Sequence, residues 1–178
     1  MGIQHDLAIG RVGENLVRKL FATQNETILA VPRSTYDVEM INPLSSFVYS
    51  AKSGKPLSLT IEVKYDLYAN KSGNIAIEIF NPKTQKDSGL RVTIAQLWAH
   101  IIPTATDNNI WITQTNWLRS YIAETSPTKI LVNKYQNATL KLYPKEKILH
   151  DIFVLMTPAK LPQFLDFLND RDTDQWII

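Results

Sequence analysis

The sequence contains no cysteine, and only three of its 178 residues are histidine. The absence of thiols excludes disulfide bonds and zinc sites made of thiolates. The histidines are His5, His100 and His150, and none lies close enough to another in sequence to form the short-spaced motif of a histidine-rich zinc site. These absences disfavour zinc chemistry and agree with a reducing compartment.

Long apolar runs are missing as well. No stretch approaches the roughly 20 apolar residues that span a bilayer, so we expect no membrane partner. The first residues, MGIQHDLAIG, lack the charged and then apolar pattern of a secretory signal. We therefore expect a cytoplasmic location.

Net charge is small, at +2, although hydrophobic residues make up 44% of the chain and charged residues 20%. This composition is typical of a globular protein, and the length is that of one ordinary domain. A protein with so little net charge needs a local cluster of Lys and Arg if it binds nucleic acid, because phosphates are neutralised by nearby cations.

Hydrophobic periodicity predicts one α/β domain over residues 1–178, with helices around a central mixed β-sheet. Helices are predicted at 6–22, 93–97, 115–123 and 158–169, and residues 42–56 are predicted to form a hairpin or an inserted loop. The predicted strands are 27–31, 36–40, 57–65, 74–79, 110–113, 129–133, 139–143 and 151–156.

The strand at 57–65 carries the most informative pattern. Its apolar residues alternate with polar ones, so Glu62 and Lys64 project from the same face. A carboxylate binds a hard divalent cation through oxygen. An ammonium beside it can orient water or stabilise the charge on a phosphate under attack. The pair is therefore suited to the hydrolysis of phosphodiesters.

A second carboxylate is needed for a magnesium site, and Asp37 is the natural candidate. It begins the predicted strand at 36–40, and antiparallel pairing with 57–65 would bring it beside Glu62. Glu14 is the one carboxylate near the buried edge of the first helix, so it is a candidate for a third oxygen ligand. A surface glutamate whose stem covers the core is the alternative for Glu14.

An acidic residue at the start of one strand, followed by Glu-x-Lys on the next, resembles the PD-(D/E)xK nuclease superfamily. Tyr36 stands where that motif name has Pro, and Asp37, Glu62 and Lys64 match its Asp, Glu and Lys. The later segments EVKYD, SGNIAIEI, SGL and T-x-A-x-x-W resemble small phage-type and junction-resolvase-like members, and a homing endonuclease of cyanobacterial introns. Gln96 departs from the phage-type pattern, which often has an acidic residue there, so that position receives no catalytic role.

The resemblance implies a restriction-endonuclease-like core and DNA hydrolysis with Mg²⁺, for which Mn²⁺ can substitute. Products would be a 5′-phosphate and a 3′-hydroxyl. Asp37, Glu62 and Glu14 would hold the metal, and Lys64 would position or polarise the nucleophile. Residues 1–102 would form the catalytic core, and 103–178 would complete the fold or serve oligomerisation or specificity. It also favours a bacterial, archaeal or phage origin.

Supporting roles are assigned on weaker grounds. Asp66 would orient Lys64 or act only as a cap at the end of its strand, and Glu78 would support the site or be merely solvated. The loop at 81–91 would contact DNA phosphates, or be basic only for solubility, and Ser88 with its neighbouring glycine would allow DNA close to the backbone or simply form a turn. The candidate DNA contacts are Lys83, Lys86, Ser88 and Arg91.

The biological role stays open at this stage. Homing, restriction-like and junction-resolving endonucleases all use such a site, on duplex or branched DNA. Cutting both strands with one site per chain calls for two subunits, so a homodimer or a higher homo-oligomer is expected. The alternatives are a DNA-binding or accessory protein that keeps the fold without catalysis, and a nuclease for RNA or single strands.

Overall fold

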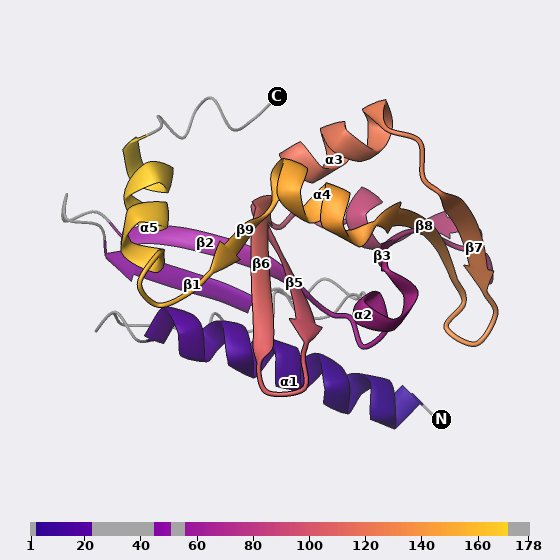
Figure 1. Ribbon diagram of the computed structural model, residues 1–178, viewed down its shortest axis with the longest axis horizontal. Coiled ribbons are helices and arrows are strands. Elements are labelled where there is room, and N and C mark those ends of the chain that lie inside the picture. Colours follow the sequence, from indigo (N-terminus) through magenta and orange to yellow (C-terminus); the bar gives the residue numbers. More distant parts are fainter. Residues whose placement is uncertain (1–2, 23–44, 51–55, 171–178) are drawn as a thin grey trace.

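The computed structural model describes residues 3–22, 45–50 and 56–170 (Figure 1). Within these ranges, no helix is long and apolar enough to cross a membrane. The elements, in chain order, are α1 (Ile3–Ala22), β1 (Ser45–Ser50), β2 (Pro56–Tyr65), α2 (Ala69–Ser72), β3 (Asn74–Asn81), β4 (Lys86–Asp87), the 3₁₀ turn η1 (Gly89–Arg91), β5 (Leu97–Pro103), β6 (Asn108–Gln114), α3 (Thr115–Glu124), β7 (Lys129–Asn133), β8 (Ala138–Pro144), α4 (Lys145–Ile152), β9 (Val154–Met156) and α5 (Leu161–Asp170).

The larger sheet has five strands in the order β1-β2-β5-β6-β9. β2 pairs with β5 in parallel, and the other neighbours pair antiparallel. This sheet is mixed and helices flank it, as the sequence predicts. Of the two alternatives expected at 42–56, a hairpin and an inserted loop, the described residues favour the hairpin, because β1 pairs antiparallel with the first half of β2.

A second sheet has four antiparallel strands in the order β4-β3-β8-β7. The sequence predicts a single central sheet, and the presence of a second sheet corrects that prediction. Strands β3 and β4 lie in the chain between β2 and β5, so the connection that crosses between these parallel neighbours itself contributes to the second sheet. Parallel strands always need such a long connection, and here it holds strands where a helix is usual.

One hydrophobic core lies between α1 and the larger sheet. Val17 and Leu20 of α1 pack with Ile61 and Val63 of β2 and with buried residues of β5, β6 and α5. Gly13 lets the helix come close to the strands, since a Cβ there would lie 3.3 Å from atoms of Tyr65 and Ile101. Helix α1 therefore covers the face of β2 opposite to the one that carries Glu62 and Lys64.

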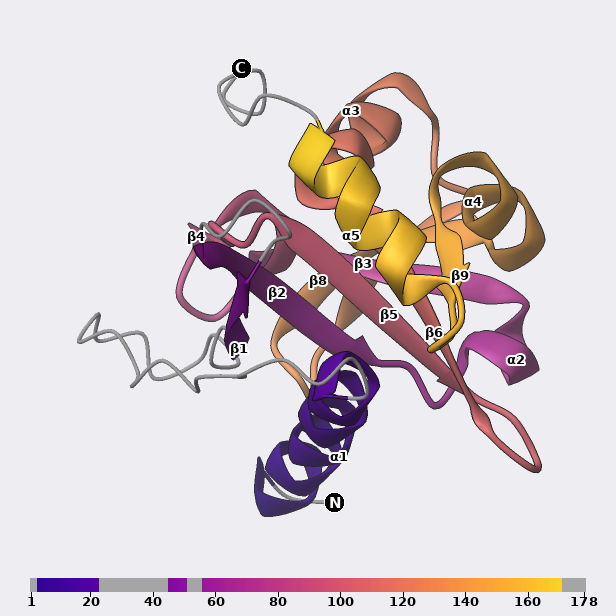
Figure 2. The ribbon, with the colours of Figure 1, turned by 90° about the vertical axis from the view of Figure 1, so that its left-hand side faces the viewer.

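A second core joins the other face of the larger sheet to the smaller sheet, α3 and α4. Its fully buried members include Trp98 of β5, Ile75 and Ile77 of β3, Leu118 of α3 and Ile148 of α4. Figures 1 and 2 show β2 and β5 lying between α1 on one side and the pair α3 and α4 on the other. The residues that share a face with Trp98 thus point into the middle of the molecule.

Two predictions of secondary structure are wrong. The helix predicted at 93–97 is absent, and the chain instead enters the central strand β5 at Leu97. All six residues from Leu97 to Ile102 are buried, so this strand has no polar face and shows none of the alternation used to recognise strands. The strand predicted at 151–156 is reduced to β9, because α4 continues through Ile152.

Candidate active site

Glu62 and Lys64 form an ion pair on the interior face of β2. Strand alternation predicts that the two side chains share one face, and they do. The Lys64 Nζ lies 2.7 Å from Glu62 Oε1. The Glu62 side chain is only 1% exposed and that of Lys64 is 24% exposed. A carboxylate so far from water needs a close cation or hydrogen-bond donors, and Lys64 supplies the charge.

The parallel neighbour β5 places two more side chains beside this pair. Trp98 stands opposite Glu62 and His100 stands opposite Lys64 in the register. The Lys64 Nζ lies 5.6 Å from the centre of the Trp98 ring, within reach of a cation–π attraction. Lys64 is therefore held between a carboxylate and an aromatic face.

Thr93, in the turn that leads into β5, binds the other oxygen of Glu62. Its hydroxyl donates to Glu62 Oε2 at 3.3 Å and accepts from the Ala95 backbone N–H at 3.2 Å. The carbonyl of Thr93 accepts a hydrogen bond from the guanidinium of Arg119 on α3. Arg119 also donates to the carbonyl of Leu90 at 3.2 Å, and burial lowers the pKa of its guanidinium.

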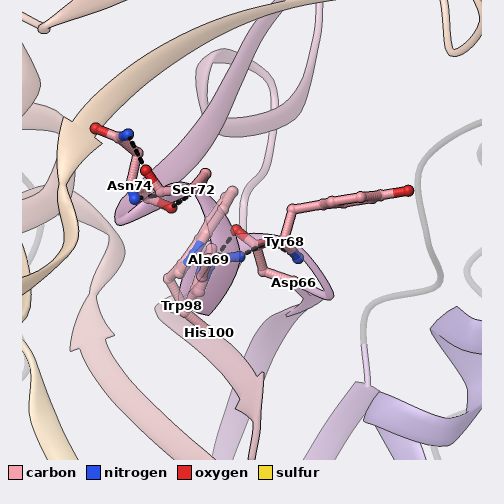
Figure 3. Close-up of polar contacts among 7 residues, drawn as sticks. All are labelled: Asp66, Tyr68, Ala69, Ser72, Asn74, Trp98 and His100. Atoms are coloured by element: carbon pink, nitrogen blue, oxygen red, sulfur yellow. Dashed lines mark hydrogen bonds and ion pairs between the residues drawn. The ribbon is translucent and has the colours of Figure 1, made fainter.

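Asp66, His100 and Trp98 form a second polar chain (Figure 3), and His100 is the partner of Lys64 in the register of β2 and β5. The Trp98 Nε1 lies 3.5 Å from His100 Nδ1, and His100 Nε2 lies 3.2 Å from Asp66 Oδ2, where an N–H on Nε2 donates to the carboxylate. Asp66 Oδ1 accepts from the N–H groups of Tyr68 and Ala69, both at 2.9 Å. Asp66 therefore holds the turn that leads into α2 and also contacts the histidine.

The pKa of Asp66 reflects these contacts. Burial alone would raise the pKa of this carboxyl group, but the hydrogen bond and charge of His100 and the two backbone donors together hold it below the ordinary value of 3.8. The alternatives expected for Asp66 are a residue that orients Lys64 and a cap or turn residue at the end of its strand. Its bonds to Tyr68 and Ala69 show the turn, and its role toward Lys64 stays a prediction.

Asp37, the expected second metal ligand, lies outside the described residues, as do the strands predicted at 27–31 and 36–40. Within the part of the chain that the structure describes, the antiparallel partner of β2 is β1, which pairs with residues 56–61. The pairing that would bring Asp37 beside Glu62 therefore stays a prediction.

Glu14 is buried, with 6% of its surface exposed, as its place at the edge of α1 predicts. Its carboxylate lies 3.6 Å from Arg18, one helical turn away. Helix α1 packs on the face of β2 that carries Ile61 and Val63, opposite to the face of Glu62, so this packing does not bring Glu14 to Glu62. Among the described residues, no three carboxylates or histidines lie together as a ready metal cluster. A metal role for Glu14 thus stays a prediction too.

The weaker candidates lie along the β3–β4 hairpin and the turn after it. Gly89 has a φ of +54°, and a Cβ there would lie 2.4 Å from the Glu78 carbonyl oxygen. The close approach expected around Ser88 is thus to strand β3. Ser88 Oγ is buried and, within the described residues, has no hydrogen-bond partner. Glu78 is half-buried on β3 and faces away from the core that contains Trp98, so it is not brought to Glu62.

The basic candidates are exposed, as a DNA contact requires. Lys83 and Lys86 stand on the hairpin, and Arg91 pairs with Asp87 at 2.8 Å. Arg91 also lines an open hollow of about 290 Å³ together with two cations that the sequence analysis misses, Arg119 and Lys141. The rest of its lining is apolar: Leu90, Ile122 and Ala123.

Thr93 and His100 are not predicted as site residues from the sequence. The helix wrongly predicted at 93–97, in place of strand β5, is the reason in both cases. With β5 read as a strand, Trp98 and His100 would share a face at the same two-residue spacing as Glu62 and Lys64. The turn before that strand would then place Thr93 near the pair. The signal was the run Leu97 to Ile102, which is long enough for a strand buried on both faces.

Comparison of the chain with models of protein families found no match, and comparisons with curated proteins and with solved structures also found none. The assignment of a function therefore depends on the site itself.

Glu62 is a carboxylate that could help to hold a hard cation. Mg²⁺ prefers carboxylate oxygen and is usually bound by one or two carboxylates, with water filling its other positions. Glu62 provides one such carboxylate, and its two oxygens face different partners, Lys64 and Thr93. The chemistry of Glu62 fits the ion, and the expected second ligand, Asp37, would complete the pair.

Proposed function

We propose that the protein is a magnesium-dependent DNA endonuclease whose active site contains Glu62, Lys64 and Asp37. The observation that carries the proposal is the buried Glu62–Lys64 pair, with its oxygen and nitrogen 2.7 Å apart on one face of a central strand. Burial of an ionised carboxylate costs free energy, so a fold retains one in its interior mainly where it has a partner or a task.

The proposed fold is a restriction-endonuclease-like core. The mixed sheet, the helix α1 on one face and the Glu-x-Lys strand beside a parallel neighbour agree with such a core. The resemblance of residues 1–102 to the PD-(D/E)xK superfamily is the reason for naming this fold rather than another mixed α/β fold.

In the proposed reaction, a water molecule attacks phosphorus in line with the bond to the 3′-oxygen. The new P–O bond forms as that bond breaks, the water gives up a proton, and the 3′-oxygen gains one. A bound Mg²⁺ would activate the water and offset negative charge on the phosphate. Glu62 and Asp37 would hold the ion, with Glu14 as a further candidate, and the ammonium of Lys64 would donate to the water or to a phosphate oxygen.

DNA would reach the site along the exposed basic side of the molecule. The hollow is lined by Arg91, Arg119 and Lys141, and none of the described residues in its wall is acidic, which suits a phosphate of the DNA backbone. Lys83 and Lys86 are exposed on the β3–β4 hairpin and would add further phosphate contacts. Two copies of the chain would be needed to cut both strands of a duplex, so we propose a homodimer or a higher homo-oligomer.

One observation favours a second function, a DNA-binding protein without catalysis. The two oxygens of Glu62 already have partners in Lys64 and Thr93. A buried ion pair of this kind would also serve as a purely structural contact. Such a protein would bind DNA and leave it intact.

Incubation with supercoiled plasmid and with a four-way junction, in magnesium or in chelator, tests the choice. We expect magnesium-dependent cleavage by the wild-type chain that Glu62→Ala and Lys64→Ala both lose. Preference for the junction would indicate a resolving enzyme, and a single cut in long genomic DNA would indicate a homing or rare-cutting enzyme. Binding without cleavage of any DNA would overturn the proposal in favour of the accessory protein.

A further inference from the structure

We propose that Thr93 is a positioning residue that fixes the orientation of the Glu62 carboxylate for metal binding, and that Arg119 holds Thr93 in place. The inference rests on the proposed function and adds two residues to its site. It comes from a continuous chain of hydrogen bonds that runs from helix α3, through the turn before β5, to the carboxylate on β2.

The Glu62 carboxylate is held from two sides. Lys64, two residues further along the same strand, approaches Oε1 at 2.7 Å. Thr93, 31 residues away in sequence, donates to Oε2 at 3.3 Å. With each oxygen bound to a different element, rotation of the carboxylate about its last bond would break both contacts. The plane of the group is therefore set by the fold.

The direction of the threonine hydrogen bond is also set. A hydroxyl has one hydrogen to donate and lone pairs that accept. The N–H of Ala95 points at Thr93 Oγ1 from 3.2 Å and takes up an acceptor position. The hydroxyl hydrogen is then available for Glu62, whose ionised carboxylate can only accept. Thr93 is itself only 3% exposed, so water does not compete strongly for this contact.

Arg119 fixes the backbone that carries Thr93. Its guanidinium donates to the carbonyl of Leu90, within η1, and to the carbonyl of Thr93, two residues after η1 ends. A third bond, to Asn116 Oδ1 at 3.0 Å, holds the guanidinium against its own helix. A planar group with fixed donors is suited to bridging two carbonyls, and the ammonium of lysine cannot reproduce that geometry.

A side chain that orients a metal-binding carboxylate influences the metal without touching it. Loss of such outer contacts typically lowers metal affinity or activity about 10- to 100-fold. The chain supplies a matched comparison in Thr113 on β6, which is also 3% exposed. Its buried hydroxyl has no hydrogen-bond partner among the described residues. Replacement of either threonine by valine removes a buried hydroxyl, but only Thr93 loses a bond to Glu62.

The experiment compares the full-length wild-type chain with Thr93→Val, Thr93→Ser, Thr113→Val and Arg119→Lys. Mn²⁺ affinity is measured by electron paramagnetic resonance titration, and cleavage of plasmid is measured with kcat and KM separated. We expect Thr93→Val to lower Mn²⁺ affinity about tenfold or more, with kcat falling and the KM for DNA unchanged. Thr93→Ser keeps the hydroxyl and should restore both readouts, Thr113→Val should match the wild type, and Arg119→Lys should lie between.

Equal Mn²⁺ affinities for Thr93→Val and Thr113→Val would overturn the inference, as would a wild-type protein that binds no Mn²⁺. If Thr93→Val fails to fold, Arg119→Lys decides, and wild-type affinity in that variant would overturn the role of Arg119 and the chain of bonds with it. Failure of the proposed function gives a different result: the wild type binds Mn²⁺ and cuts no DNA. In that case, the order of the variants in Mn²⁺ affinity still tests the role of Thr93.

Discussion

Two pairs of a lysine and a carboxylate have the same separation in this molecule and opposite surroundings. Glu62 and Lys64 on β2 approach to 2.7 Å, and so do Lys147 and Asp151 on α4. On β2, the side chain of Glu62 is 1% exposed and that of Lys64 is 24% exposed. On α4, the side chain of Asp151 is 28% exposed and that of Lys147 is 62% exposed. The separation of the charges alone therefore does not predict how much a pair contributes to stability. The access of water to the pair decides it.

The partners around each pair sharpen the difference. On α4, the hydrogen bond from Lys147 lowers the pKa of Asp151, and the same bond raises the pKa of Lys147. Both groups stay in contact with solvent, where salt and water screen their attraction. On β2, the carboxylate has Thr93 and Lys64 as neighbours, and the aromatic ring of Trp98 lies against the cation. Only this second arrangement has the enclosed geometry of a reactive centre.

Removal of the cation should have the largest effect on stability. Lys64→Met leaves the buried Glu62 without its positive partner, and we expect the free energy of unfolding to fall by about 2 to 3 kcal/mol. This is just below the usual cost of about 3 to 5 kcal/mol for breaking a buried pair, because Lys64 is about a quarter exposed. Lys147→Met should leave stability unchanged within error. Urea unfolding measures both, and equal midpoints for the two variants would remove the distinction between the pairs.

A third carboxylate, Asp66, should contribute less to the stability of the fold as the pH falls. Its pKa is lowered in the folded protein, so its contribution to stability is fully present above the ordinary value of 3.8 and is lost as pH falls through the lowered folded value. We expect Asp66→Asn to destabilise the protein by about 1.5 kcal/mol at neutral pH, the scale of hydrogen bonds to a charged group.

The difference in the free energy of unfolding between Asp66→Asn and the wild type should then become smaller as the pH drops below about 4, since the wild-type carboxylate becomes protonated. Thermal unfolding across this pH range measures it. A difference that stays constant down to the lowest pH at which the protein folds would show that the charge of Asp66 does not matter, and that His100 needs only a hydrogen-bond acceptor.

The exposed pair of Arg91 and Asp87 should matter to DNA and hardly to folding. Both side chains are about half exposed, so Arg91→Ala should leave the unfolding midpoint nearly unchanged. If Arg91 contacts a phosphate, the slope of log affinity against log salt for DNA binding should fall by about 1. Fluorescence anisotropy at several salt concentrations measures the slope, with Lys147→Ala as the control. An unaltered slope for Arg91→Ala would remove the hollow from the DNA path.

The sequence predicts the centre of the site better than its surroundings. The shared face of Glu62 and Lys64 follows from strand alternation alone, and the burial of Glu14 follows from its position on an amphipathic helix. Both are confirmed. Contacts between residues far apart in sequence were out of reach, because Thr93 and Arg119 meet the site only through the way β5 and α3 pack.

For the fold as well, local features are predicted and long-range pairings are not. The mixed sheet and its flanking helices are predicted, yet its central strand β5 is missed because burial on both faces removes the alternation that marks a strand. The smaller sheet is missed because pairing between β3 and β8 joins segments about 60 residues apart. Local patterns specify elements, and they do not specify which distant elements pair.

Cleavage of supercoiled plasmid in magnesium by the wild type, Glu62→Gln and Asp151→Asn tests the central claim most directly. These two substitutions each remove one negative charge from a carboxylate 2.7 Å from a lysine, one buried and one exposed. We expect the wild type and Asp151→Asn to cut at the same rate and Glu62→Gln to be slower by at least about 100-fold, since several kcal/mol of metal-assisted stabilisation is lost. Equal rates for all three proteins, or no cleavage by the wild type, would contradict the assignment of Glu62 to an active site.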